Sequence, residues 1–196
     1  MTEPNRTELL RRLDNLLRLG TIAEVDYLKA LVKVQSGNIL TDWLPWVAFR
    51  AGTTQSWSPP TTGEQCLVLA VSGELTTAVV LVGIYTQNAP NQSPDEHCIK
   101  FADGMELKYN QASGHLTVKN CKTANIQATN SITADTPSFT CTGNVVIQGS
   151  LSVKGAISTQ GSMTAQGEVS GKGIKLSTHT HSGVESGDKR TGTPNG

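Results

Sequence analysis

Two histidines, His179 and His181, stand near the end of the chain in the sequence Thr-His-Thr-His. Residues two apart in an extended strand point to the same side, about 6.6–7 Å apart along it, so both imidazoles would face one way. One chain then supplies two nitrogen ligands, which is too few for a closed metal site. Three chains around an axis would supply six, an octahedral set that suits a transition metal such as iron better than four-coordinate zinc. The alternative is that two exposed histidines simply end a strand.

The residues before this pair form an internal repeat that could position it. Glycine recurs every six residues, and an apolar residue stands two positions after each of the first five glycines. The glycines are Gly143, Gly149, Gly155, Gly161, Gly167 and Gly173, and the apolar residues are Val145, Leu151, Ile157, Met163 and Val169. The even-numbered positions between them are mostly polar. This pattern is typical of a β-solenoid with one buried stripe.

One copy of this repeat has nothing in its own chain against which to bury the stripe, and an extended strand leaves backbone groups unpaired. Each Val, Ile, Leu or Met would contribute roughly 1.5–3 kcal/mol if fully buried. Three chains make the smallest closed prism, so we predict a homotrimeric β-helix. The odd-numbered register reaches Lys175 just before the histidines. Three Lys175 ammonium groups on one axis would repel one another without an anion, which predicts a chloride-like site unless a register slip at Gly171 or Gly173 turns Lys175 outward.

The fold class is predicted to be mainly β, with four regions. Residues 1–20 contain an amphipathic helix over residues 5–19 that ends at Gly20, and its leucine face would pack on its own domain or on neighbouring copies. Residues 21–95 carry five short strands, which suit a small barrel of the OB type. Residues 96–142 form a β-hairpin across Asp103-Gly104 and the start of the β-helix. Residues 143–196 carry the glycine repeat and the metal-binding tip.

Composition narrows the classes of function. The chain has 16 Lys+Arg and 16 Asp+Glu, so its net charge is zero, which disfavours a nucleic-acid partner. We therefore expect Trp43, Trp46 and Trp57 to serve the barrel core and subunit contacts rather than base stacking. The four cysteines lack C-x-x-C spacing and favour buried free thiols in a protein made in the cytoplasm. Neither a nucleophile–base–acid set nor a phosphate loop is present, so we do not expect an enzyme.

Several motifs combine across nearly the whole chain. They are Thr41-Asp42-Trp43-Leu44-Pro45-Trp46, Gly63-Glu64-Gln65, Gly73-Glu74-Leu75, Gly83-Ile84-Tyr85, Phe101-Ala102-Asp103-Gly104, the glycine repeat, His179-Thr180-His181 with Gly183, and Thr191-Gly192-Thr193-Pro194. Together they resemble the baseplate spike proteins (baseplate assembly protein V) of contractile-tailed bacteriophages.

The resemblance implies a homotrimer with an N-terminal OB-fold domain and a C-terminal triple-stranded β-helix that tapers to a point. It implies one structural iron ion per trimer, held by His179 and His181, with calcium and chloride as further ions along the axis. It also implies attachment to other baseplate and tail hub proteins through the N-terminal domain. The protein would be made in the host cytoplasm, lie at the tip of the virion's tail baseplate, and pierce the host outer membrane when the sheath contracts.

Three rival interpretations stay open at this point. A trimeric hexapeptide-repeat acyltransferase also has a six-residue period, but one turn of its coil takes ~18 residues, and its catalytic histidine would not be one of a pair at the extreme end. The valine–glycine-repeat spikes of bacterial secretion systems are related but usually much longer. A nucleic-acid-binding OB protein is disfavoured by the zero net charge.

Overall fold

The structure is a computed structural model that describes residues 5–180 and residue 187. The chain divides into two compact units, Met1–Gln127 and Ala128–Gly196. No helix among the described residues is long and apolar enough to cross a membrane.

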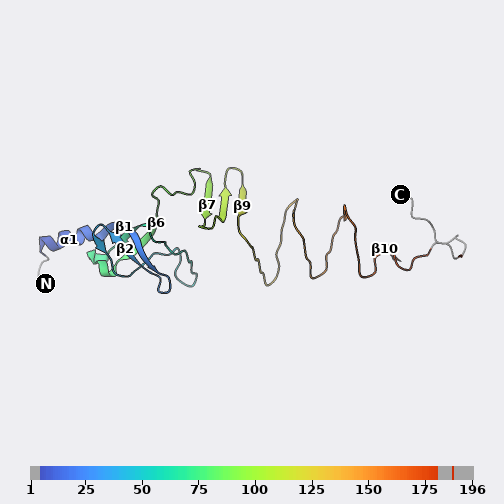
Figure 1. The fold of residues 1–196 in the computed structure, drawn as a ribbon, viewed down its shortest axis with the longest axis horizontal. Helices are drawn as coiled ribbons and strands as arrows, with labels where there is room; N and C mark the ends of the chain where they lie inside the picture. The colour runs from blue at the N-terminus through green and yellow to red at the C-terminus, as the bar shows by residue number, and fades with distance from the viewer. Residues whose placement is uncertain (1–4, 181–186, 188–196) are drawn as a thin grey trace. The chain divides into compact units, whose positions relative to one another are not determined.

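The first unit opens with helix α1 (Arg6–Leu16), which leads without a loop into strand β1 (Leu17–Asp26; Figure 1). The Asn5 side chain caps the helix by accepting a hydrogen bond from the Thr7 backbone N–H at 3.3 Å. The helix therefore ends three residues before the predicted position, and the assignment of Gly20 to a helix end is wrong. Gly20 lies inside β1, where an added Cβ would stand 2.3 Å from Cγ1 of Val34. Close packing of β1 on its neighbour explains this glycine.

Six strands then close a small barrel. The sheet order is β3-β2-β1-β5-β6, β4 pairs with β2, and a bridge from Trp46 to Val80 joins the chain after β4 to β6. The strands after β1 are β2 (Leu31–Ser36), β3 (Ile39–Leu40), β4 (Leu44–Pro45), β5 (Gln65–Leu69) and β6 (Val79–Ile84). Two short 3-10 turns, η1 (Val71–Gly73) and η2 (Leu75–Thr77), connect β5 to β6.

The barrel core is formed by alternate residues of these strands. Every second side chain of β2 and β5 is buried, as expected for strands with one face toward a core. The buried hydrophobic residues are Ile22, Val32, Val34, Leu44, Cys66, Val68, Ala70, Ala78 and Val80. Cys66 is thus a buried free thiol as predicted, whereas Cys98 is half-buried and Cys121 and Cys141 are exposed in this single chain.

A three-stranded antiparallel meander follows the barrel. Its strands are β7 (Glu96–Lys100), β8 (Glu106–Asn110) and β9 (His115–Lys119). The predicted hairpin across Asp103-Gly104 is confirmed, with Gly104 at a positive φ of 90°. His115 begins β9, and His97 lies within β7.

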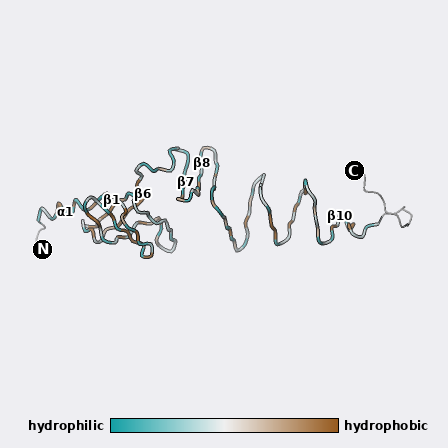
Figure 2. Tube along the Cα trace, viewed as in Figure 1, coloured by the Kyte–Doolittle hydropathy of each residue, from teal (hydrophilic) through white to brown (hydrophobic). Residues whose placement is uncertain are grey.

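Residues 121–169 are extended and form no helix or strand. Within residues 144–169 the backbone bends at residues 148–149, 154–155, 160–161 and 166–167, so each of these four bends ends on one of the repeat glycines. Apolar residues recur along this path, drawn as brown segments of the tube in Figure 2, and their side chains are exposed in the single chain. Among the residues that the structure describes, two short strands follow, β10 (Ser170–Gly171) and β11 (Ile174–Lys175). The β-helix, which needs strands from other chains, stays a prediction.

Candidate functional site

A tight hairpin precedes the first of the two candidate histidines. β10 and β11 pair antiparallel, with Ser170 opposite Lys175 and Gly171 opposite Ile174. The turn residues Lys172 and Gly173 have positive φ values of 50° and 81°, which is the pattern of a two-residue type I′ turn. The backbone N–H of Leu176 donates to the Val169 carbonyl at 2.8 Å and extends the pairing by one step.

This hairpin changes the register on which the sequence prediction relied. Residues paired across an antiparallel ladder share a face, so Val169 and Leu176 lie on the same side as Ile174. Lys175 shares the opposite face with Ser170. The apolar stripe therefore continues through Ile174 and Leu176, and the odd-numbered register does not run unbroken into the histidines. The turn at Lys172-Gly173 puts Lys175 on the side opposite these apolar residues, which is the register slip left open in the sequence, and the anion site at Lys175 stays a prediction.

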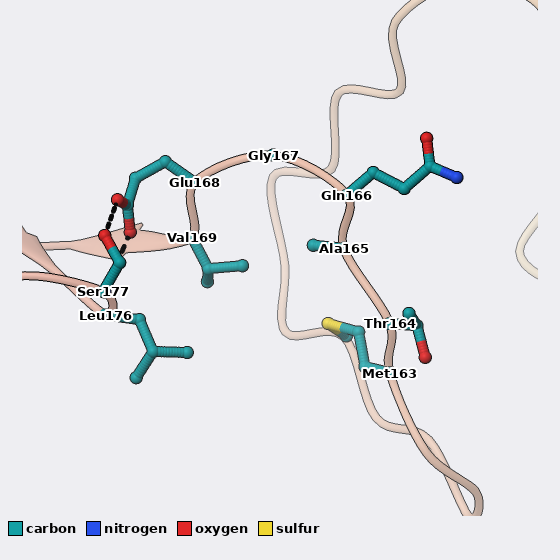
Figure 3. A pocket seen from close by; sticks show the side chains of 9 residues that line it. All are labelled: Met163, Thr164, Ala165, Gln166, Gly167, Glu168, Val169, Leu176 and Ser177. Atoms are coloured by element: carbon teal, nitrogen blue, oxygen red, sulfur yellow. Dashed lines mark hydrogen bonds between the residues drawn. The ribbon is translucent and has the colours of Figure 1, made fainter.

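A carboxylate holds the chain beyond the hairpin. The backbone N–H of Ser177 donates to Glu168 Oε1 at 3.2 Å, and the Ser177 hydroxyl donates to the same carboxylate. Both bonds appear as dashed lines in Figure 3. The hydroxyl bond and then the backbone bond hold the pKa of Glu168 below its usual value. Glu168 and Ser177 are functional candidates that the sequence prediction missed, because only the hairpin brings these residues together.

His179 follows a turn at Leu176–Thr178 instead of lying in an extended strand. Its backbone N–H donates to the Lys175 carbonyl at 3.1 Å, and its Nδ1 lies 3.0 Å from the Leu176 carbonyl oxygen. An Nδ1–H that donates to this carbonyl leaves the lone pair of the neutral ring on Nε2. Ligating histidines are usually oriented by such a bond from their second nitrogen. The donor chemistry of His179 therefore fits a metal ligand.

In the described part of the chain, His179 lies beside apolar residues. It lines a recess of about 330 Å³ together with Val169, Gly171, Ile174 and Leu176. Among the described residues, no group of three or more His, Cys, Asp or Glu side chains could hold a metal ion. His181 lies outside the described residues. The metal site at His179 and His181 therefore stays a prediction.

A larger hollow of about 780 Å³ lies beside the last bend of the repeat, along residues 163–169 and 176–177 (Figure 3). Met163, Ala165 and Val169 point into it with Leu176, whereas Thr164 and Gln166 point away. The alternation predicted for the repeat is thus present in residues 163–169, and Leu176 after the hairpin extends the apolar side.

The tryptophans of the barrel are only partly covered. Trp46 packs against the core and lies 5.5 Å from the more exposed Trp57, centroid to centroid, with the rings tilted. Lys33 Nζ stands 4.7 Å over the ring of Trp43. The core role expected for these side chains is confirmed for Trp46, whereas Trp57 is 60% exposed.

Comparison with known proteins gives three consecutive family matches. Residues 18–85 match the type VI secretion system/phage-baseplate injector OB domain, residues 120–172 match the phage spike trimer, and residues 173–195 match the GpV Apex motif. The chain is also 40% identical to the spike protein of Escherichia phage P2, over 98% of this chain and 99% of that protein.

These matches decide two of the sequence predictions. The OB assignment of the barrel is confirmed, since the matched range begins in β1 and ends just after β6. The matched families are structural spike and baseplate proteins, so the chain is not an enzyme and the acyltransferase alternative is rejected.

Proposed function

The chain belongs to the family of phage baseplate spike proteins, and we propose that three copies form the membrane-piercing spike at the tip of a tail baseplate. The observation that carries this proposal is the regular set of bends every six residues, with an apolar stripe that a single chain leaves uncovered. Three stripes around one axis would cover one another and pair the extended backbones.

The repeat glycines support assembly from several chains. No repeat glycine from Gly143 to Gly167 has a positive φ, and an added Cβ at any of them would meet nothing within 4 Å. Neither backbone conformation nor packing within the chain therefore calls for glycine at these bends. A neighbouring chain that approaches each bend closely would account for the spacing. The family model that matches residues 120–172 describes a phage spike trimer, which supports three as the number of chains.

At the tip, His179 and His181 from three chains would hold one iron ion. Bound iron would supply a structural cross-link between the three chains, because six protein nitrogens leave no position for a substrate. The Glu168–Ser177 bonds and the hairpin fix the path of the chain toward His179. Calcium and chloride along the axis stay expectations from the family resemblance, with no ligands assigned in this chain.

The proposed role in piercing a membrane follows from the stiffness of a closed β-helix. A closed β-helix has its strands paired and its core continuous, which makes a stiff needle, and its end is where fraying would begin. An ion shared by three chains would tie that end together. The N-terminal domain would attach the needle to other baseplate and hub proteins, so that contraction of the tail drives the tip through the host outer membrane.

Elemental analysis of the purified full-length protein tests the tip. The wild type should contain one iron per three chains, and His179→Ala/His181→Ala should contain none. The matched control His97→Ala/His115→Ala changes two histidines of the β7–β9 meander and should keep the iron. Iron retained by the tip variant, or absent from the wild type, would remove the histidines from the proposal.

A further inference from the structure

The outer face of the barrel sheet carries a block of exposed leucines. On β1, β5 and β6 the residues that alternate with the core residues pair across the strands, Leu17 with Leu69 and Leu19 with Leu67. Leu67 pairs in turn with Leu81, and Leu69 with Val79. We call these six residues the sheet patch. Its members Leu17 and Leu19 are 63% and 60% exposed, and Leu81 is 42% exposed. Leu67, Leu69 and Val79 are half-buried, so the sheet patch is an apolar surface that the described residues leave partly uncovered.

Helix α1 presents a second leucine surface, which we call the helix patch. It consists of Leu9, Leu10, Leu13 and Leu16. All four side chains are exposed, and Leu13 is 60% exposed. Because α1 runs directly into β1 (Figure 1), the two patches belong to consecutive elements of one domain.

The helix is held to its own domain by its polar side, which leaves the helix patch facing outward. Glu8 binds Arg11 and Arg12, and Arg11 reaches Glu74 beyond η1 at 3.2 Å. Gly73 of η1 approaches the helix so closely that an added Cβ would lie 2.4 Å from the Arg12 carbonyl oxygen. Asn15, one turn further along the same side, is buried. The docking side of the helix is thus polar and tightly fitted, and among the described residues its leucines stay exposed.

Cyclic symmetry explains why one domain would carry two such patches. In a closed three-fold ring each contact is heterologous, so every subunit needs two different surfaces that fit each other. The sheet patch and the helix patch both consist of uncharged aliphatic side chains, and Thr21 and Gln65 border the sheet patch as a polar rim. A helix with an apolar stripe lying on an apolar sheet face is a standard layer arrangement.

We propose that the helix patch of one copy packs on the sheet patch of the next copy in the trimer. This rests on the proposed trimer, because the spike holds three N-terminal domains together and so raises their effective concentration. The contact makes the barrel domains a second trimerisation element, independent of the repeat and of the tip. We favour a second copy of this chain over another baseplate protein as the partner of these patches. Trimerisation through the repeat would hold two further copies of the N-terminal domain beside each one.

Hydroxyl-radical footprinting of the full-length wild type tests this contact without any substitution. Leu13, Leu19 and Leu81 should be oxidised several-fold more slowly than Leu28, a leucine of the same domain that is 99% exposed and outside both patches. Oxidation rates that merely follow the single-chain exposures of 60%, 60% and 42% would overturn the proposal. If the oxidation rates follow the single-chain exposures and the native mass is that of a trimer, the proposed spike is kept and the patches are assigned to contact with a different baseplate protein. A monomeric native mass would refute the proposed function itself.

A pair of variants then tests whether the two patches touch each other. Leu13→Glu in the helix patch should raise the oxidation rate of Leu81 in the sheet patch, because the covering helix is expelled. Leu28→Glu is the matched control and should leave Leu81 protected. Leu44 of the barrel core, which is buried, should stay protected from oxidation in all variants, which checks that the barrel is folded. Unchanged protection of Leu81 in folded Leu13→Glu would overturn the proposal.

Discussion

The apolar stripe of the repeat can be tested at Ile157, a residue in the middle of the ladder. Ile157 is 62% exposed in the single chain. Full burial of isoleucine contributes about 1.5–3 kcal/mol, so covering the exposed share in a trimer would contribute roughly 1–2 kcal/mol per chain. Replacement by alanine also leaves a cavity, and such substitutions in packed cores cost about 2–5 kcal/mol. Three identical sites are affected in each trimer.

Thermal unfolding of Ile157→Ala at fixed protein concentration, followed by circular dichroism, measures this loss. We expect a clearly lower unfolding temperature for the repeat than in wild type. The control is Ser158→Ala, the neighbouring position on the polar side, which should change the free energy of unfolding by no more than about 0.5 kcal/mol. If Ile157→Ala unfolds at the same temperature as Ser158→Ala, the stripe is not buried against other chains and the reasoning fails.

Three further predictions concern particular contacts. Gly73→Ala should destabilise the barrel more than Gly63→Ala in urea unfolding. Both glycines have a positive φ, at which a Cβ costs about 1–2 kcal/mol, but only at Gly73 would the Cβ also clash with the backbone of α1. Equal unfolding midpoints would mean that α1 moves away from Gly73 without a cost in stability. Ser177 lowers the folded-state pKa of Glu168, so the bond stabilises the hairpin at pH values above the usual carboxyl pKa of about 4.5 and is lost as pH falls through the folded pKa. The protection of the Ser177 amide against exchange, relative to its intrinsic rate at each pH, should therefore fall in acid, and Glu168→Gln should abolish this pH dependence. Burial raises the pKa of Cys66 to about 11, so its thiol should resist alkylation at pH 8 until urea unfolds the barrel. Rapid alkylation of Cys66 in the folded protein would contradict its position in the core.

Strand alternation and turn chemistry were readable from the sequence because they are local. The Asp103-Gly104 hairpin follows from a glycine that accepts positive φ. The position at which α1 ends is not determined by local sequence. Leu17 and Leu19 fit a helix as well as a strand, and their pairing with Leu69 and Leu67 in β5 decides for the strand. That pairing is a tertiary contact, and tertiary contacts override weak helix propensity.

The candidate tip shows the same division. The pair of histidines and the apolar stripe could be recognised from spacing alone, and the family matches confirm the kind of protein to which they belong. The hairpin turn at Lys172-Gly173 reverses the chain and moves Lys175 to the polar face, which a straight count of odd positions does not register. Glu168 and Ser177 are nine residues apart, and no sequence pattern marks their contact.

The most direct test of the account is the native mass spectrum of the full-length wild-type protein. The account predicts one dominant species at three times the chain mass of 20.8 kDa, with one bound iron ion. A trimer without iron would contradict the proposed tip and keep the spike. A species at the mass of a single chain would contradict the central claim, because one chain has nothing against which to bury the stripe of its repeat.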